Sequence, residues 1–156
     1  MVPLILPFRP VIKDFPISAP FGEVRTKNDD TYTHNGIDFA VPVGTEVYAM
    51  IDGTVFRAGW EKDPMVDPNN MDVGFGLRIW QTFMIPQNRH FYGWYGHLSK
   101  LLVKEGEEIK AGQLIGLSGD TGRTYSSKHK GKAPHLHVQA REKNTNAFFD
   151  IAWENG

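Results

Sequence analysis

The sequence predicts an all-β domain, and three features of the chain carry this prediction. Short apolar runs, several with period-2 alternation, recur along the 156 residues, and turns separate them, since the chain holds 16 Gly and 10 Pro. Segments with the 3.6-residue spacing of an amphipathic helix are almost absent. Many short strands joined by glycine-rich turns are typical of an all-β sheet, sandwich or barrel-like domain.

The length and composition fit one domain with a hydrophobic core. Hydrophobic residues make up 40% of the 156 residues, which argues against disorder. The formal net charge is -1, so the chain lacks the basic stripe that nucleic-acid partners require. Cysteine is absent, which excludes disulfides and thiolate metal sites. Any metal ion must therefore be held by His, Asp or Glu.

In chain order, residues 1–20 are expected to form an N-terminal extended arm, because prolines interrupt their apolar stretch. The stretch is short and has no positive n-region, so it predicts neither a signal peptide nor a membrane span. A turn at residues 20–22 follows. Residues 23–33 are polar, and we expect them to form a loop.

Asp52-Gly53 is the strongest turn signal in the first half of the chain, because this dipeptide favours two-residue β-hairpins. It predicts a hairpin between residues 47–51 and residues 54–58. Residues 59–74 contain two Asp-Pro steps and are expected to form a long loop.

The second half predicts a further strand pair, residues 76–82 with residues 90–97, connected through residues 86–88. Residues 103–119 alternate short apolar runs with glycine turns, which indicates a tight β-turn-β arrangement. Residues 120–133, rich in Lys and Ser, are expected to form a polar loop.

The last predicted strand, residues 133–141, carries two histidines two positions apart. His135 and His137 alternate with Leu136 and Val138, so the two imidazoles share one face and the apolar pair faces a core. Neutral imidazole is the commonest metal ligand in proteins. Two surface histidines would give the same pattern, so this segment alone leaves both interpretations open.

Three further residues extend this cluster of candidate groups. His34 and Asp38 stand four apart and can reach one metal ion, and His97 ends an aromatic-rich strand. Catalytic zinc takes three protein ligands and leaves one position for water. Four histidines and one aspartate exceed that need, so the remaining imidazoles would act as a general base and an oxyanion stabiliser. No H-E-x-x-H helix is present, which excludes that class of metalloprotease.

The arrangement resembles the lysostaphin/LytM-type M23 family of zinc metallopeptidases. Three motifs carry the resemblance: His34-x-x-x-Asp38, Tyr95-Gly96-His97-Leu98-Ser99 and His135-Leu136-His137. It extends from about Phe21 to Arg141 and includes framing turns such as Val103-Lys104-Glu105-Gly106 and Ser118-Gly119-Asp120-Thr121-Gly122.

The resemblance implies that His34, Asp38 and His137 bind Zn²⁺, and that His97 and His135 form the catalytic pair. It also implies an antiparallel β-sheet core of the duplicated hybrid motif type, with a substrate groove walled by loops. The implied substrates are peptide cross-bridges or stem peptides of peptidoglycan. We expect a single peptidase domain over residues 1–156, with an arm (1–20), a catalytic core (21–141) and a tail (142–156).

Other residues receive weaker assignments. Tyr32 lies two residues before His34 and is a candidate groove residue that could hydrogen-bond a reacting group. His90 is expected at a strand edge and His129 in solvent, both without a ligand role. The loops at 61–74 and 123–132 look longer than is usual in the family and would wall the groove.

Two other functions compete with a peptidase. A non-catalytic M23-like module that regulates cell-wall hydrolases would have a broken ligand set, which is not seen. A biotinyl or lipoyl carrier needs a modifiable lysine at a hairpin tip, which is also not seen. We expect a monomer without nucleic-acid or membrane partners that acts on the extracytoplasmic cell wall. A phage-type lysin would need no signal peptide for this.

Overall fold

The computed structural model describes residues 10–13, 17–27, 30–61, 74–122, 124–126 and 131–149, and every regular element in these ranges is a β-strand. The all-β prediction is confirmed. The strands are β1 (Ile17–Ala19), β2 (Val24–Lys27), β3 (Asp30–Thr33), β4 (Ile37–Phe39), β5 (Glu46–Tyr48), β6 (Gly53–Trp60), β7 (Leu77–Ile85), β8 (Arg89–Leu101), β9 (Glu108–Ile109), β10 (Leu114–Ser118), β11 (Tyr125–Ser126), β12 (Gly131–Lys132), β13 (Leu136–Glu142) and β14 (Phe148–Phe149).

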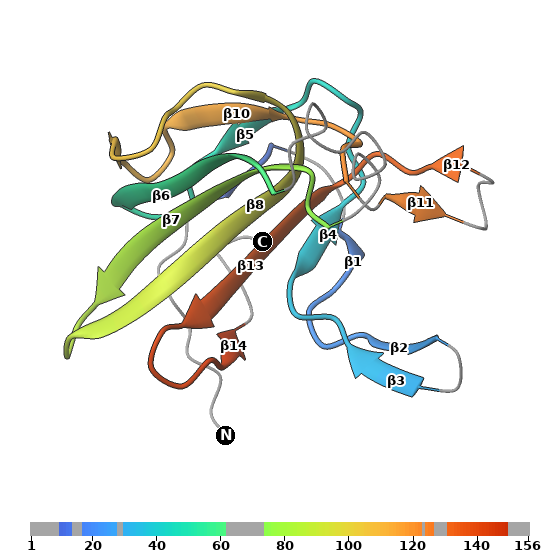
Figure 1. Cartoon of the computed structure of the whole chain (residues 1–156), viewed down its shortest axis with the longest axis horizontal. Coiled ribbons are helices and arrows are strands. Elements are labelled where there is room, and N and C mark those ends of the chain that lie inside the picture. Colours follow the sequence, from blue (N-terminus) through green and yellow to red (C-terminus); the bar gives the residue numbers. More distant parts are fainter. Residues whose placement is uncertain are drawn as a thin grey trace.

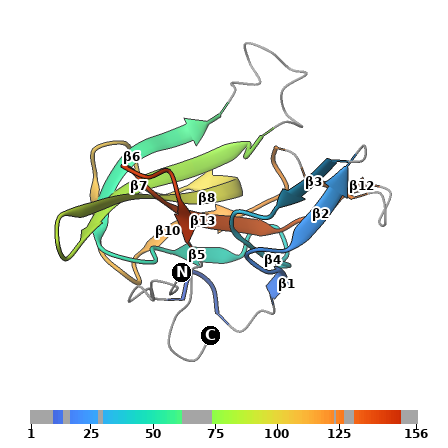
Figure 2. The same ribbon diagram turned by 90° about the horizontal axis from the view of Figure 1, so that it is seen from below.

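Ten of these described strands form one sheet, in which the pairs are antiparallel. Its main path runs β1-β4-β13-β8-β7-β6-β9, and β10 pairs with β5 and β8 while β14 pairs with β13. Figure 1 shows β6, β7, β8 and β13 lying side by side across the molecule. The hairpins β2–β3 and β11–β12 are separate two-stranded sheets on the same side of the molecule in Figures 1 and 2.

The long hairpin β7–β8 is the central element, and it confirms the strand pair predicted around residues 86–88. Gln87 and Asn88 have φ of 72° and 57° in its turn, a region in which Asn is enriched. Alternate residues of β7 point into the core, which is the period-2 pattern of a sheet with one buried face.

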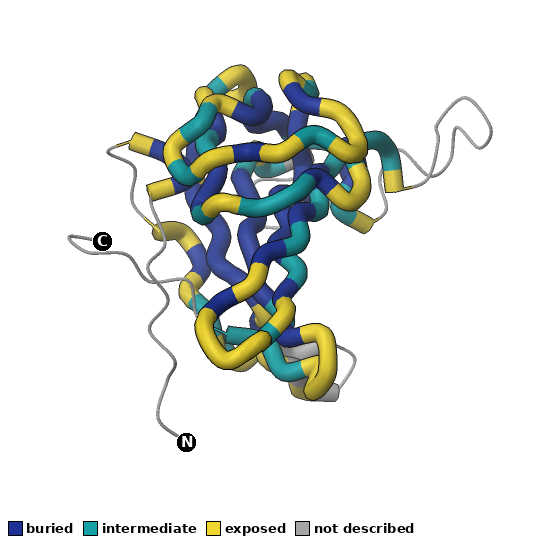
Figure 3. Tube along the Cα trace, turned by 90° about the vertical axis from the view of Figure 1, so that its left-hand side faces the viewer, coloured by how far each residue is buried: buried dark blue, intermediate teal, exposed yellow. Residues whose placement is uncertain are grey.

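The hydrophobic core lies on one face of the main sheet. Figure 3 shows buried residues along the middle of the strands and exposed residues in the turns. The largest fully buried apolar side chains include Tyr95, Phe39, Phe91, Met50 and Ile79. On β13, Leu136 and Val138 are completely buried, as their alternation with the histidines predicts.

The hairpin predicted at Asp52-Gly53 is wrong. β5 pairs with β10, whereas β6 pairs with β7 and β9. The chain instead turns a corner here, where Ala111 N donates to the Asp52 carboxylate over 2.8 Å. A Cβ at Gly53 would lie 2.2 Å from the Thr82 carbonyl oxygen, so this glycine permits the close approach of β7.

Three other segments also differ from the predictions. Residues 23–33 form the hairpin β2–β3 and not the expected loop. Their β-branched residues favour strands. The apolar Val24 is 70% exposed, so it gave no sign of a buried strand face. In residues 103–119, β9 pairs with β6 and β10 pairs with β5 and β8, so these two strands form no hairpin together. The expected loop 120–133 contains the short pair β11–β12.

Some predictions fall outside the described residues. These concern residues 1–9, the part of the 59–74 loop from 62 to 73, residues 127–130 and the tail beyond 149. Within the expected arm, Val11 and Ile12 are buried against the core, and residues 17–19 join the main sheet as β1. In the described ranges, no helix has the length and apolar character needed to cross a membrane.

Candidate metal centre

Strand pairing brings His34, Asp38 and His137 together. The β4–β13 register places Asp38 directly opposite His137, and paired residues on one face lie close together. His34 follows β3, and its backbone is fixed because its N–H donates to Glu23 O and its carbonyl accepts from Gly22 N. All three side chains are buried, and one ligand atom from each lies within 4.8 Å of the others.

The three groups of this trio lie close enough to converge on one ion. His137 Nδ1 lies 2.7 Å from Asp38 Oδ1, and His34 Nε2 lies 3.3 Å from Asp38 Oδ2. Burial raises the pKa of Asp38, but hydrogen bonds with His137 and His34 lower it further, so the pKa falls well below its usual range. The carboxylate is therefore ionised, as a metal ligand must be.

The tautomers of the two imidazoles test whether the trio fits a metal. His34 Nδ1 donates to the Pro20 carbonyl (3.0 Å), and His137 Nε2 donates to Gln139 Oε1 (2.9 Å). When the rings are neutral, their opposite nitrogens direct lone pairs toward Asp38, whose oxygens are acceptors too, so the hydrogen bonds that lower the pKa of Asp38 require a proton on these nitrogens. A proton on His137 or a cation among the three groups satisfies these acceptors. The donor set thus fits a divalent metal such as zinc.

Gly36 makes room for this arrangement. A Cβ at Gly36 would lie 2.4 Å from the Val138 carbonyl oxygen and 2.8 Å from His137 Nε2. Any larger residue would therefore push β13 and its ligand away from β4.

His97 and His135 lie beside the trio, with ring centroids 4.5 Å apart. His97 Nδ1 donates to Thr121 O over 2.7 Å, and His135 Nδ1 donates to Ala133 O over 2.8 Å. These bonds leave the Nε2 lone pair of each neutral ring for the site, and His135 Nε2 lies 3.8 Å from Asp38 Oδ1.

The backbone of His97 is left-handed, with φ of 63°, a region that histidine enters more readily than most residues. Its N–H donates to Phe75 O over 2.7 Å, and the Phe75 ring stacks on His137 with centroids 5.1 Å apart. Burial, and then the charge of His135, lower the pKa of His97 to about 3. His97 is therefore neutral near pH 7 and can accept a proton.

The remaining predicted residues lie apart or outside the described side chains. Tyr32 belongs to β3, but its side chain lies outside the described part of the chain. His90 is exposed on β8 opposite Met84, and His129 is not among the described residues.

Sequence reasoning missed Gln139, Phe75 and Thr121, which orient the histidines. Gln139 could have been found, because it continues the period-2 series of His135 and His137 on one strand face. Phe75 and the Thr121 carbonyl had no such signal, since they reach the site through loops remote in sequence.

Comparison with known proteins places this geometry among metallopeptidases. The model described as peptidase family M23 matches residues 32–148. The glycyl-glycine endopeptidase ALE-1 of Staphylococcus capitis is 41% identical over 115 residues, which cover 74% of this chain and 25% of the relative. The peptidoglycan DD-endopeptidase ShyA of Vibrio cholerae is 38% identical over 107 residues, which cover 68% of this chain and 20% of the relative.

Among solved structures, a zinc containing peptidase from Vibrio cholerae is similar with a TM-score of 0.67 and 30% identity, covering 89% of this chain and 37% of that chain. The chain spans a quarter or less of the two curated relatives ALE-1 and ShyA. The family match over residues 32–148 contains all five candidate residues.

Proposed function

The chain belongs to peptidase family M23, and on this premise we propose that it is a zinc-dependent endopeptidase that cleaves peptide bonds of bacterial peptidoglycan. The observation that carries the proposal is the buried trio of His34, Asp38 and His137 with His97 and His135 beside it. The relatives support the substrate class, since ShyA is a peptidoglycan endopeptidase and ALE-1 cleaves between glycines. A similar solved structure contains zinc.

Each group has a role in this proposal. His34 Nε2, one carboxylate oxygen of Asp38 and His137 Nδ1 would hold the metal. Bound zinc would lower the pKa of a water ligand and polarise the substrate carbonyl. The His97–His135 pair accepts the proton of the attacking water, and His97 is neutral near pH 7. Once protonated, the pair donates to the oxyanion and then returns a proton to the leaving amine.

The rival is a non-catalytic module that binds the wall or regulates another hydrolase. Such a module has no use for a complete ligand set or for imidazoles locked in metal-binding tautomers. The orientation of His34 by Pro20 O and of His137 by Gln139 therefore favours the enzyme.

Mass spectrometry of fragments released from purified peptidoglycan tests the proposal. The panel includes glycine-bridged walls and directly cross-linked walls, treated with zinc-loaded, chelated and reloaded protein. We expect new peptide termini with the zinc-loaded and reloaded samples alone. The bond cut then separates cross-bridge from stem-peptide cleavage. A folded, zinc-loaded protein that releases nothing from any wall would favour the regulatory module.

The expected phage-type origin stays a prediction, as do action outside the cytoplasm and a monomeric state. Lysis of intact cells by protein added from outside, compared with expression inside the cell, tests the side from which it acts. Sedimentation of the zinc-loaded protein gives the oligomeric state.

A further inference from the structure

The sheet face that carries His137 continues into an aromatic surface outside the metal centre. Gln139 and Arg141 follow His137 on the same face of β13, because residues two apart in a strand point the same way. On β8, Trp94 and Tyr92 lie directly opposite Gln139 and Arg141.

The surface extends across two more strands. Trp80 of β7 lies opposite Trp94, and their rings meet edge to face with centroids 4.6 Å apart. A register shift between Val55 and Arg57 in β6 accompanies the stacking of Phe56 on Trp80, at 6.1 Å and 18°. We call Phe56, Trp80, Tyr92 and Trp94 the aromatic platform.

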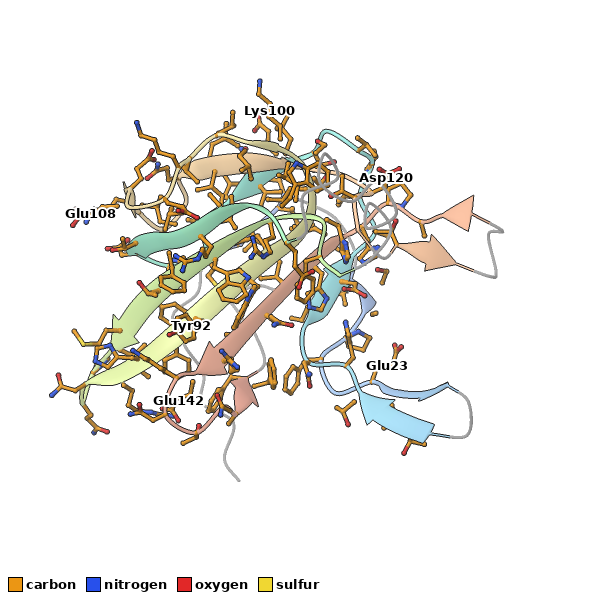
Figure 4. All side chains as sticks on the ribbon, in the orientation of Figure 1. Glu23, Tyr92, Lys100, Glu108, Asp120 and Glu142 are labelled. Carbon is orange, nitrogen blue, oxygen red and sulfur yellow. The ribbon has the colours of Figure 1, made fainter. Side chains whose placement is uncertain are left out.

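The aromatic platform is partly open to solvent and close to the reacting groups. Phe56 is 37% exposed, Trp80 and Tyr92 are half-buried, and Trp94 is buried beneath them. Figure 4 shows Tyr92 over the strands of the main sheet. Strand geometry gives about 3.3 Å per residue and about 4.8 Å between strands. On this scale the near edge of the platform, Trp94, lies about 8 Å from His137, and its far edge, Phe56, lies about 15 Å from His137.

Guanidinium groups lie over the rings of the aromatic platform. Arg141 lies over Tyr92 and Trp94, at 5.5 Å and 5.1 Å. Arg78 lies over Trp80 at 5.1 Å, and Arg57 lies over Phe56 at 4.3 Å. The charge at Arg78 is partly offset by Glu61 and Glu105. The three guanidinium groups therefore offer hydrogen-bond donors, and the two carboxylates weaken the positive field that would attract a polyanion.

The residues of the aromatic platform suit one chemical part of a cell-wall polymer better than another. β7 and β8 are paired on both sides, so the platform presents no row of unpaired backbone groups to hold an extended peptide. It offers partly exposed aromatic rings together with guanidinium donors that lie over them. A sugar ring matches this pattern, because it has one C–H face and a rim of hydroxyl groups.

We propose that the aromatic platform binds the glycan strand of the wall while the metal centre acts on the attached peptide. An amino sugar stacks on Phe56, Trp80 and Tyr92, and Arg78 and Arg141 donate to its oxygens. The identity of the polymer rests on the proposed function, but the binding of sugar does not require activity.

Binding is measured first on the metal-free protein with N-acetylchitotetraose as the probe, by tryptophan fluorescence and amide chemical shifts. We expect Phe56→Ala and Tyr92→Leu each to weaken binding about fivefold or more. Met84→Ala is the matched control, because Met84 is 59% exposed and lies on the same face of β7 beyond the platform. It should bind like the parent protein. Absence of probe binding by the folded parent protein would overturn the proposal.

Kinetics provide the second test, with thermal unfolding used to confirm that each variant folds. On intact wall, the platform variants should raise KM about fivefold or more and leave kcat unchanged. On a glycan-free cross-bridge peptide they should match the parent protein. Equal losses on both substrates would assign the platform to the peptide and overturn the proposal. If zinc-loaded protein cleaves neither substrate but binds the probe, the proposed function fails while the glycan site stands.

Discussion

Each histidine of the candidate centre has one ring nitrogen fixed by an acceptor in the protein. Main-chain carbonyls orient His34, His97 and His135, and the Gln139 amide orients His137. This contact decides the tautomer, and the tautomer decides which nitrogen faces the site. The predictions for single residues therefore separate ligands, reacting groups and orienting groups.

Removal of a proposed ligand should remove the metal. We expect His137→Ala to retain almost no zinc and to lose wall lysis, because two ligands hold the ion far more weakly than three. His90→Ala is the control, since His90 is an exposed histidine on a neighbouring strand. Zinc content by atomic absorption decides the matter, and full occupancy in His137→Ala would contradict the assignment.

Removal of a reacting imidazole should spare the metal. His97→Asn is the suitable change, because φ is 63° at this position and Asn tolerates the left-handed region better than Ala does. We expect retained zinc and a loss of kcat of roughly a hundredfold or more. Loss of zinc from this variant would mean that the roles of the histidines are reversed.

Removal of the orienting amide should weaken zinc binding without abolishing it. In Gln139→Leu, His137 Nε2 loses its acceptor, and we expect zinc affinity to fall about 10-fold to 100-fold. Gln139→Glu keeps an acceptor and should bind zinc at least as tightly as the parent protein. Competition with a chelator of known affinity measures both variants, and equal affinities for Leu and the parent would exclude the orienting role.

The five candidate residues could be singled out from sequence because each sits in a short local motif. The strand period of His135 and His137 and the spacing of His34 and Asp38 left other interpretations open, so the resemblance to a family was needed to combine them into one site, which the structure brings together. The geometry beyond these motifs could not be predicted. The stacking of Phe75 on His137 depends on where a loop ends after strand pairing is complete.

Among the elements, a buried hydrogen-bond network replaces the hairpin that residues 47–58 do not form. The Tyr95 hydroxyl of β8 accepts from Met50 N over 2.8 Å and donates to Gln81 Oε1. Gln81 Nε2 in turn donates to Ile51 O over 2.9 Å. These hydrogen bonds connect the corner between β5 and β6 to the central hairpin β7–β8.

Tyr95→Phe should test this network. The change leaves Met50 N–H and Gln81 Oε1 buried without the hydroxyl, and we expect it to lower the free energy of unfolding by about 2 kcal/mol or more. Tyr92→Phe is the control, because Tyr92 is half-buried on the opposite face, and its effect should stay within about 0.5 kcal/mol. Urea unfolding measures both, and equal values would mean that the network adds little.

Strands were predicted well where one face is buried, and poorly where pairing is remote. β7 shows alternating burial that the sequence displays directly, whereas the middle of β8 and most of β13 are buried continuously. The partners of β5, β9 and β10 depend on contacts between distant segments, so the local Asp52-Gly53 signal misled. β2 and β3 are held by backbone pairing, which leaves no apolar pattern to detect.

At the level of the whole molecule, the buried centre makes stability depend on pH when metal is absent. The pKa of His97 is about 3 in the folded chain and near its ordinary 6.5 when unfolded. The unfolded chain therefore binds the extra proton first as pH falls. This stabilisation is complete above pH 6.5 and declines from there toward pH 3.

We expect the metal-free protein to lose up to about 1.4 kcal/mol of stability per pH unit from this group. Urea unfolding between pH 7 and 4.5 measures the slope and stays above the range in which Asp38 contributes. His97→Asn should flatten the curve. An identical slope in this variant would show that other groups control the acid sensitivity.

Three of the four imidazoles take their orientation from main-chain carbonyls of Pro20, Thr121 and Ala133. Every amino acid supplies such a carbonyl, so these contacts depend on the path of the loops and not directly on the side chains at the three positions. Thr121 also helps to fix its own loop, because its hydroxyl accepts from Leu77 N and donates to Leu98 O. Gln139 is different, because its contribution resides in the side chain. A substitution of Gln139 alone can therefore change how tightly zinc is held. The other three imidazoles change orientation only when the backbone of a loop moves.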